Sequence, residues 1–232
     1  MNKLAVMAVL FGVISSCTST HHKQAIATDE AEKHLNDGAA FASAGSLKKA
    51  VAEFDDVIEI CNRKYSDKKV KVFASRGSVE TLYYMALAAT QNIDAIAVDT
   101  TCSDAFYLRG YTELDLGNIV RAQSFVERAI EMSPNNSVYL SELAHIQQTN
   151  KKWNEALETF TESEGAAEIY SPEQLKITEL TRAKRGVGFA LTELQRFDEA
   201  EIKYKECLKL DPNDKGSAKE LEYIKSLRTK KD

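Results

Sequence analysis

Proline and glycine are scarce in this chain of 232 residues, which contains three prolines and ten glycines. Because turn-rich β-sandwiches and barrels need many such residues, their scarcity argues against these folds. The chain also lacks an excess of basic residues, since 30 lysines and arginines stand against 35 aspartates and glutamates. The resulting net charge of −5 argues against a dedicated nucleic-acid-binding protein.

The composition that remains is typical of a soluble helical protein. Hydrophobic residues make up 44% of the chain and charged residues 28%, which is the range of globular rather than disordered proteins. Leucine, alanine, glutamate and lysine dominate, and all four favour helix. The apolar run at residues 4–14 has eleven residues, whereas a membrane-spanning helix needs about twenty.

Residues 1–16 have the pattern of a secretory signal peptide, because Lys3 precedes the apolar run and small residues follow it. The residues Ile-Ser-Ser-Cys at 14–17 resemble the lipobox of bacterial lipoproteins. This resemblance implies lipidation of Cys17 and, since no aspartate follows it, an outer-membrane anchor facing the periplasm of a Gram-negative cell. Ordinary cleavage nearby, giving a soluble periplasmic protein, is the alternative.

Residues 17–30 are polar and lack periodicity, which predicts a flexible tether between the lipid and the folded body. An exported protein folds in an oxidising compartment, where cysteines pair. The three cysteines after the lipobox allow at most one intramolecular disulfide, and the sequence leaves the pair open: Cys61, Cys102 and Cys207. None of them forms a C-x-x-C motif, which argues against a thioredoxin-like site or a zinc knuckle.

Two segments of 34 residues align with each other without gaps. Both have glycine at position 8, alanine at position 20 and proline at position 32: Gly110 and Gly188, Ala122 and Ala200, Pro134 and Pro212. This pattern resembles the tetratricopeptide repeat, a helix-turn-helix unit of 34 residues. The resemblance implies an all-α fold, in which helices A and B of each repeat pack closely and successive repeats stack into a right-handed α-solenoid with a concave groove.

Other parts of the chain fit the same register. The expected repeats are 31–64, 70–102, 103–136, 137–170 and 181–214. Small residues stand at position 8 or 20 of the first and fourth: Gly38, Ala50 and Ala156. The second is the weakest copy, because it is one residue short and lacks a turn glycine. The repeat domain is thus expected over 31–214, followed by a capping helix and basic tail at 215–232.

The repeat spacing is interrupted before the last repeat. Its proline lies 78 residues after that of the third repeat, ten more than two repeats require. The extra residues, 171–180, begin with Ser171 and Pro172, a pattern typical of a helix start. We therefore expect helix A of the fifth repeat to be longer by about three turns. Residues 65–72 are expected to lengthen the second repeat in the same way.

Motifs of the common enzyme classes are missing from the sequence, including GxSxG, a Walker loop and HExxH. Only four histidines occur, and two of them lie in the predicted tether. We therefore predict no catalytic site, cofactor or metal site. A buried cluster of titratable groups in a cleft would favour an enzyme instead.

In tetratricopeptide-repeat proteins, ligands bind to the concave wall formed by helix A of each repeat. At wall positions the last three repeats carry side chains typical of interface hot spots: Tyr107, Tyr111, His145, Arg185 and Phe189. We predict that these residues line one groove. The alternative is that Tyr107 and Phe189 pack between neighbouring A helices. The family's carboxylate clamp of Lys, Asn and Arg is not matched here, apart from Arg182.

The sequence thus predicts a non-catalytic scaffold that binds a protein or peptide in a cell-envelope assembly. Contact with the membrane is expected through the N-terminal lipid alone, and contact with nucleic acid is not expected. The alternative is a carrier of a small hydrophobic ligand or a polysaccharide. Such a carrier would need an enclosed apolar cavity or a row of stacking aromatic rings.

Overall fold

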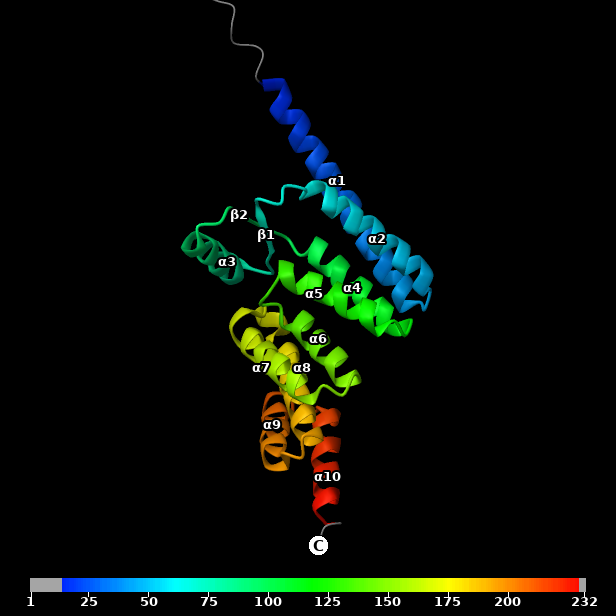
Figure 1. The fold of residues 1–232 in the computed structure, drawn as a ribbon, viewed down its shortest axis with the longest axis vertical. Helices are drawn as coiled ribbons and strands as arrows, with labels where there is room; N and C mark the ends of the chain where they lie inside the picture. Colours follow the sequence, from blue (N-terminus) through cyan, green and yellow to red (C-terminus); the bar gives the residue numbers. More distant parts are fainter. Residues whose placement is uncertain (1–13, 230–232) are drawn as a thin grey trace, which may run out of the picture.

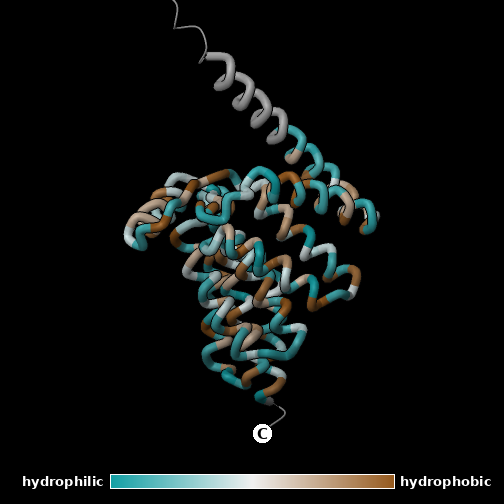
Figure 2. The backbone as a smooth tube through the Cα atoms, turned by 45° about the horizontal axis from the view of Figure 1, so that its top comes forward, coloured by the Kyte–Doolittle hydropathy of each residue, from teal (hydrophilic) through white to brown (hydrophobic). Residues whose placement is uncertain are grey.

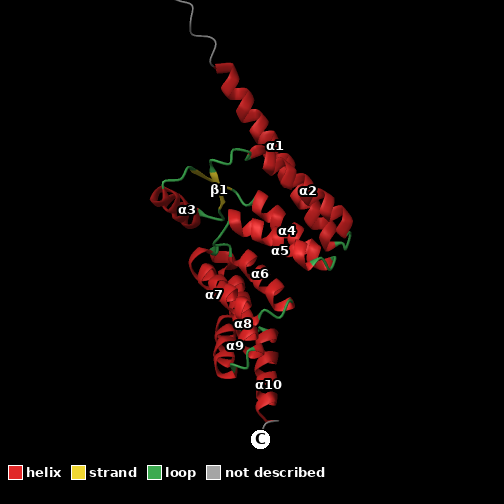
Figure 3. Ribbon diagram, in the orientation of Figure 1, coloured by secondary structure: helices red, strands yellow, loops and turns green. Residues whose placement is uncertain are grey.

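The computed structural model describes the backbone of residues 14–229 and the side chains of residues 29–228. In this part of the chain helices predominate, with one small sheet (Figure 1, Figure 3). The elements are α1 (Ile14–Ser43), α2 (Leu47–Lys64), β1 (Lys71–Ala74), α3 (Ser78–Gln91), β2 (Ala95–Val98), α4 (Thr101–Asp115), α5 (Ile119–Met132), α6 (Ser137–Thr149), α7 (Trp153–Tyr170), α8 (Glu173–Glu193), α9 (Phe197–Leu210) and α10 (Lys215–Thr229). No described helix is both long and apolar enough to span a bilayer.

Eight of the helices form four antiparallel pairs: α1–α2, α4–α5, α6–α7 and α8–α9. The pairs stack along the long axis of the molecule, and α10 packs on the last pair (Figure 1). Hydrophobic and hydrophilic residues alternate along these helices (Figure 2), as amphipathic helices around a shared core require. The predicted all-α solenoid is confirmed, with one exception described below.

The small residues of the repeat pattern lie where two helices of a pair cross. The alanines at position 20 are fully buried: Ala50, Ala122, Ala156 and Ala200. A Cβ atom on Gly188 would lie 2.8 Å from the ring of Tyr204, and one on Gly110 would lie 3.0 Å from the carbonyl oxygen of Ala122. Gly38 meets the ring of Phe54 in the same way, at 2.6 Å. These positions therefore require a small residue because the helices approach so closely.

Each proline of the repeat pattern follows the second helix of its pair. Pro134 lies two residues after the end of α5, and Pro212 two residues after the end of α9. Since proline has no N–H to donate and clashes with the preceding turn, it prevents either helix from continuing.

The prediction of a helix pair at 70–102 is wrong. Residues 65–100, which we call the insertion, contain β1, α3 and β2 in place of two helices. The strands pair in parallel, from Lys71 opposite Ala95 to Ala74 opposite Val98. α3 covers one face of this sheet, where Phe73 stacks on Tyr84 with ring centroids 4.8 Å apart. Figure 1 shows the insertion to the left of the helix stack.

Two short apolar runs explain this difference. The strands Lys-Val-Phe-Ala and Ala-Ile-Ala-Val are rich in β-branched and aromatic residues and flank a single helix, a pattern that favours a βαβ unit. The expectation that residues 65–72 lengthen a helix is wrong for the same reason, because they lead into β1. The Arg-Gly pair at 76–77 has the same two residues as the repeat at 109–110, but it lies in the loop between β1 and α3.

The N-terminal helix also departs from the prediction. α1 begins at Ile14, so the whole of the predicted flexible tether at 17–30 is helical. No proline or glycine occurs between Ile14 and Asp37, and this uninterrupted stretch allows the helix of the first repeat to extend backwards. Residues 1–13 of the predicted signal peptide lie outside the described residues.

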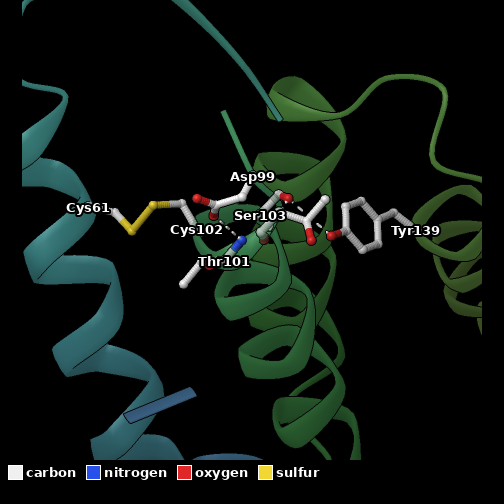
Figure 4. Close-up of a disulfide and its surroundings, with 7 residues drawn as sticks. Cys61, Asp99, Thr101, Cys102, Ser103 and Tyr139 are labelled. Carbon is white, nitrogen blue, oxygen red and sulfur yellow. Dashed lines mark hydrogen bonds between the residues drawn. A yellow bond between two sulfur atoms is a disulfide. The ribbon is translucent and has the colours of Figure 1, made fainter. Parts of the chain in front are cut away.

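One disulfide joins two helices on either side of the insertion. Cys61 at the end of α2 is bonded to Cys102 at the start of α4, 41 residues later (Figure 4). The bond therefore closes a covalent loop around the whole insertion. Cys207 is buried and unpaired, and burial raises the pKa of its thiol.

The insertion and the lengthened helix meet in a buried polar cluster. α8 has 21 residues, compared with 15 in α4, and its additional N-terminal part carries Glu179. Arg76 Nη1 donates to Glu179 Oε1 and Oε2 at 2.8 and 2.9 Å, and Ser137 Oγ donates to Oε2 at 2.5 Å. Ser171 also donates to this carboxylate. We call these four residues the Arg76 cluster; they connect the two segments that depart from the repeat pattern.

Candidate peptide-binding groove

A pocket of about 400 Å³ opens between α6, α8 and α10. Three of the five residues predicted for the groove line it, namely His145, Arg185 and Phe189. Its other lining residues are Ser141, Gln148, Phe160, Arg182, Gly186, Tyr204, Gly216 and Glu220. We call this site the α8 pocket. The helix A positions of the fourth and fifth repeats therefore do converge on one concavity.

Close packing of α7 against α8 shapes one wall of the α8 pocket. A Cβ atom on Gly186 would lie 2.3 Å from the ring of Phe160, so only glycine lets that ring occupy its position. Tyr204 contributes a second aromatic wall from α9. The repeat pattern does not predict Gly186, Phe160 or Tyr204 as site residues, because it marks Gly188, not Gly186, as the packing glycine.

Arg185 is anchored to the start of α10. Its Nη1 donates to Asp214 Oδ1 at 2.9 Å, and the side chain remains 41% exposed. The Asp214 carboxylate also accepts hydrogen bonds from Ser217 Oγ at 2.5 Å and Gly216 N at 3.1 Å. Burial alone would raise the pKa of Asp214, but the Ser217 hydrogen bond and the charge of Arg185 lower it below its ordinary value. Arg185 thus has a structural role as well as a place in the pocket.

A second arginine links the pocket to the preceding repeat. Arg182 Nη2 donates to the buried carboxylate of Glu142 at 2.7 Å, and the Tyr107 hydroxyl lies near both charges. Tyr107 stacks on Tyr139 with ring centroids 5.1 Å apart, and burial raises the pKa of its hydroxyl. These contacts join three consecutive repeats. Arg182, the one residue that matches the carboxylate-clamp pattern, is already paired with Glu142 of this chain.

The five predicted residues therefore differ in how they are held. Tyr107 is half-buried against Tyr139, and Phe189 is half-buried with its ring centroid 6.3 Å from that of Trp153. Both thus take part in packing between helices. His145 and Tyr111 are exposed; Tyr111 lies one turn beyond Tyr107 on α4, outside the α8 pocket. The groove residues with side chains available to a partner are His145, Tyr111 and part of Arg185.

The buried carboxylates elsewhere are satisfied by neighbours. Glu113 accepts a hydrogen bond from Arg109 at 2.5 Å, and Glu80 accepts one from Tyr84 at 3.0 Å. Asp104 accepts from Tyr139 at 2.5 Å, although burial raises its pKa. None of these carboxylates lines the α8 pocket. Their partners indicate a structural role, since buried charges need pairing to be tolerated.

One group of side chains has the composition of a metal site. His34, Glu53 and Asp56 offer ligand atoms within 4.8 Å of one another on α1 and α2. His34 Nδ1 lies 2.6 Å from Glu53 Oε2, and this hydrogen-bonded pair is sufficient to account for the arrangement. Asp56 is exposed.

Comparison with known proteins agrees with the repeat pattern. Residues 103–136 and 187–214 match the tetratricopeptide repeat family. No curated protein sequence matches the chain.

Solved structures with the same fold include bacterial and eukaryotic proteins. Pseudomonas aeruginosa pilF is 13% identical, with 88% of this chain and 71% of that chain covered and a TM-score of 0.62. MamA from Desulfovibrio magneticus RS-1 is 14% identical, with 87% and 86% covered and a TM-score of 0.57. The first repeat domain of Spaghetti (RPAP3), bound to an HSP90 peptide, is 21% identical, with 57% and 99% covered and a TM-score of 0.50. From its helix pairs, its crossing residues and these matches, the chain contains tetratricopeptide repeats at residues 103–136 and 187–214 and has the fold of a tetratricopeptide-repeat solenoid.

Proposed function

We propose that this chain is a non-catalytic scaffold that binds a protein segment or peptide along α4, α6 and α8. The observation that carries the proposal is the α8 pocket, where His145, Arg185 and Phe189 from two repeats meet the capping helix. Its volume of about 400 Å³ is suited to one or two side chains of a longer ligand. The RPAP3 domain, which has the same fold, is bound to a peptide; this supports the proposal by analogy.

The lining of the pocket favours a peptide over a small hydrophobic or polysaccharide ligand. A carrier would stack its ligand on a row of free aromatic rings, but Tyr107 and Phe189 already pack on Tyr139 and Trp153. Arg185 retains exposed N–H groups, which suit a backbone carbonyl or a carboxylate of a peptide. Exposed aromatic and histidine side chains beside such donors are typical of an interface.

Tyr111→Ala and His145→Ala are expected to weaken partner binding by about 1–2 kcal/mol each, or roughly 5- to 30-fold. Both side chains are exposed, so melting temperature should change little. The measurement is quantitative recovery of partners from detergent-solubilised envelope. Tyr223→Ala is the matched control, because Tyr223 on α10 is 50% exposed and does not line the α8 pocket. Equal losses in the control and the groove variants would contradict the proposal.

We further propose that the scaffold works in a bacterial cell envelope, anchored through Cys17 to the outer membrane. The lipobox-like residues at 14–17 support this placement. Lipidation at Cys17 would leave a mature chain that begins within the residues of α1, so the helix would lead directly from the membrane to the first repeat.

Labelled palmitate is expected to be incorporated into the wild-type chain and not into Cys17→Ser, because lipidation requires that thiol. The measurement is autoradiography of the purified protein after growth with the label. Cys207→Ser serves as the control for loss of an unrelated cysteine and should retain the label. Labelling that survives the Cys17→Ser change would rule out the anchor.

A further inference from the structure

The insertion creates a second and larger cavity, away from the groove. Its volume is about 820 Å³, and it lies between the end of α2, the insertion and the pair α4–α5. Its lining residues are Cys61, Asn62, Tyr65, Ser66, Lys68, Lys69, Val70, Lys71, Val72, Ile93, Asp94, Phe106, Arg128, Glu131 and Met132. We call it the insertion pocket. It shares no lining residue with the α8 pocket, so any ligand here would be a separate one.

Apolar side chains from three parts of the chain line the interior of this pocket. Val70 and Val72 come from the insertion, Phe106 from α4 and Met132 from α5. Ile93, just before β2, is 41% exposed although it borders these residues. Covering apolar surface of this kind with a ligand is favourable, because it removes the surface from water.

The rim of the pocket is cationic, although the chain as a whole is acidic. Lys68, Lys69, Lys71 and Arg128 outnumber the two carboxylates of Asp94 and Glu131 in the lining. Arg128 is paired with Glu131, but the three lysines form no ion pair with any residue whose side chain is described. The Lys71 ammonium lies 5.6 Å from the centroid of the Phe73 ring, a cation–π contact. Ammonium groups without a carboxylate partner among the described side chains, beside an apolar surface, are complementary to a ligand with both carboxylates and apolar groups.

The backbone next to the pocket suits an extended ligand. β1 and β2 pair with each other and with no further strand in the described chain, so each retains one unpaired edge. An extended peptide adds to such an edge through main-chain hydrogen bonds, with successive side chains on opposite faces. A strand of alternating acidic and apolar residues would thus present one kind of side chain to the lysines and the other to Val72 and Ile93.

From these features we propose that the insertion pocket binds an acidic, extended segment of a protein partner. Apolar side chains of the segment cover the interior, and its carboxylates pair with Lys68, Lys69 and Lys71. The disulfide holds the walls in place, because Cys61 itself lines the pocket and is bonded to α4. This site is independent of the groove on α4, α6 and α8.

The test uses the full chain and a fluorescent, end-capped peptide of four Glu-Leu repeats. Fluorescence anisotropy should show saturable binding, with affinity at least about tenfold weaker for the Gln-Leu peptide, which has the same apolar residues without the charge. Binding should also weaken as salt concentration rises, because exposed ammonium groups are screened. Equal affinity for both peptides, or no binding of the acidic one, would overturn the proposal.

A triple variant locates the site. Changing Lys68, Lys69 and Lys71 together to glutamate should reduce the affinity for the acidic peptide at least about tenfold, since attraction becomes repulsion. The matched control changes three other exposed lysines to glutamate, on α9 and α10: Lys209, Lys215 and Lys219. This control changes the net charge by the same amount as the pocket variant, and it should bind the acidic peptide with nearly wild-type affinity. Equal loss in both triple variants would show non-specific attraction and overturn the proposal.

Two further measurements distinguish peptide binding in the insertion pocket from binding in the α8 pocket and from binding to a membrane. The methyl resonances of Val70, Val72 and Ile93 should shift on addition of the acidic peptide, whereas those near the α8 pocket should not. Shifts confined to the α8 pocket would overturn the proposal. So would binding of phosphatidylglycerol vesicles through the same lysines without binding of the peptide, because this surface would then recognise a membrane.

Discussion

Glu179→Leu is expected to lower the free energy of unfolding by about 3–5 kcal/mol, because it leaves a buried arginine without its counter-charge. The side chains of Arg76 and Glu179 are 11% and 7% exposed. Arg76 Nε and Nη2 are buried and have no hydrogen-bond partner among the described residues. Among these residues, Glu179 is therefore the sole acceptor of hydrogen bonds from the Arg76 guanidinium. The measurement is urea unfolding followed by circular dichroism.

Two controls isolate the buried charge as the cause. Arg76→Met combined with Glu179→Leu should recover most of the loss, since replacing both partners of a buried pair with apolar residues is often neutral. Glu155→Leu breaks an exposed pair with Lys152 and should change the free energy of unfolding by only about 0–1 kcal/mol. A Glu179→Leu effect as small as that of Glu155→Leu would show that the Arg76 cluster does not hold the insertion to α8.

Loss of the disulfide is expected to have a comparable effect. Replacing Cys61 and Cys102 with alanine should reduce the free energy of unfolding by about 4 kcal/mol, because the bond closes a loop of about 40 residues in the unfolded chain. The measurement is the urea midpoint of the variant and of the wild type with and without reductant. Reductant should lower the wild-type midpoint towards that of the variant and leave the variant unchanged.

Limited proteolysis gives a second view of the same bond. Without it, α2 and α4 are no longer joined across the insertion, so cleavage within residues 65–100 should become faster than cleavage in the helix pairs. Cys207→Ala, which removes the unpaired thiol, should leave the response to reductant intact. An oxidised and a reduced wild type with the same midpoint and the same cleavage pattern would contradict this role.

The repeat register was predictable because it reflects a local steric requirement. Helices A and B cross closely within a repeat, and this crossing requires small residues such as Gly188 and Ala200. Because the crossing recurs in each repeat, the small residues recur at a fixed spacing in the sequence. The structure of the insertion depends instead on the pairing of two separate strands. Its strands pair across 24 residues, so the short runs at 71–74 and 95–98 indicate strands only when considered together. The Arg-Gly pair at 76–77 has the same residues as the pair at 109–110, but it lies in a loop and not in a helix.

The sequence predicted which helix faces form the candidate site, but it did not predict the hydrogen-bond partners of the site residues within the chain. Positions within helix A placed His145, Arg185 and Phe189 together, because stacked repeats present equivalent positions side by side. The bond from Arg185 to Asp214 could not be predicted, since it depends on where the capping helix packs. The disulfide was not predictable either, because three cysteines give three possible pairs and only the fold places two of them within bonding distance.

The central claim, that a partner binds along α4, α6 and α8, is tested most directly by site-specific photo-crosslinking in intact cells. A photoreactive phenylalanine analogue replaces Tyr111 or His145 in the groove, or Tyr223 on α10 as an equally exposed control. We predict covalent adducts of the same protein from positions 111 and 145, with little or none from position 223. Adducts from position 223 that equal or exceed those from both groove positions would contradict the claim.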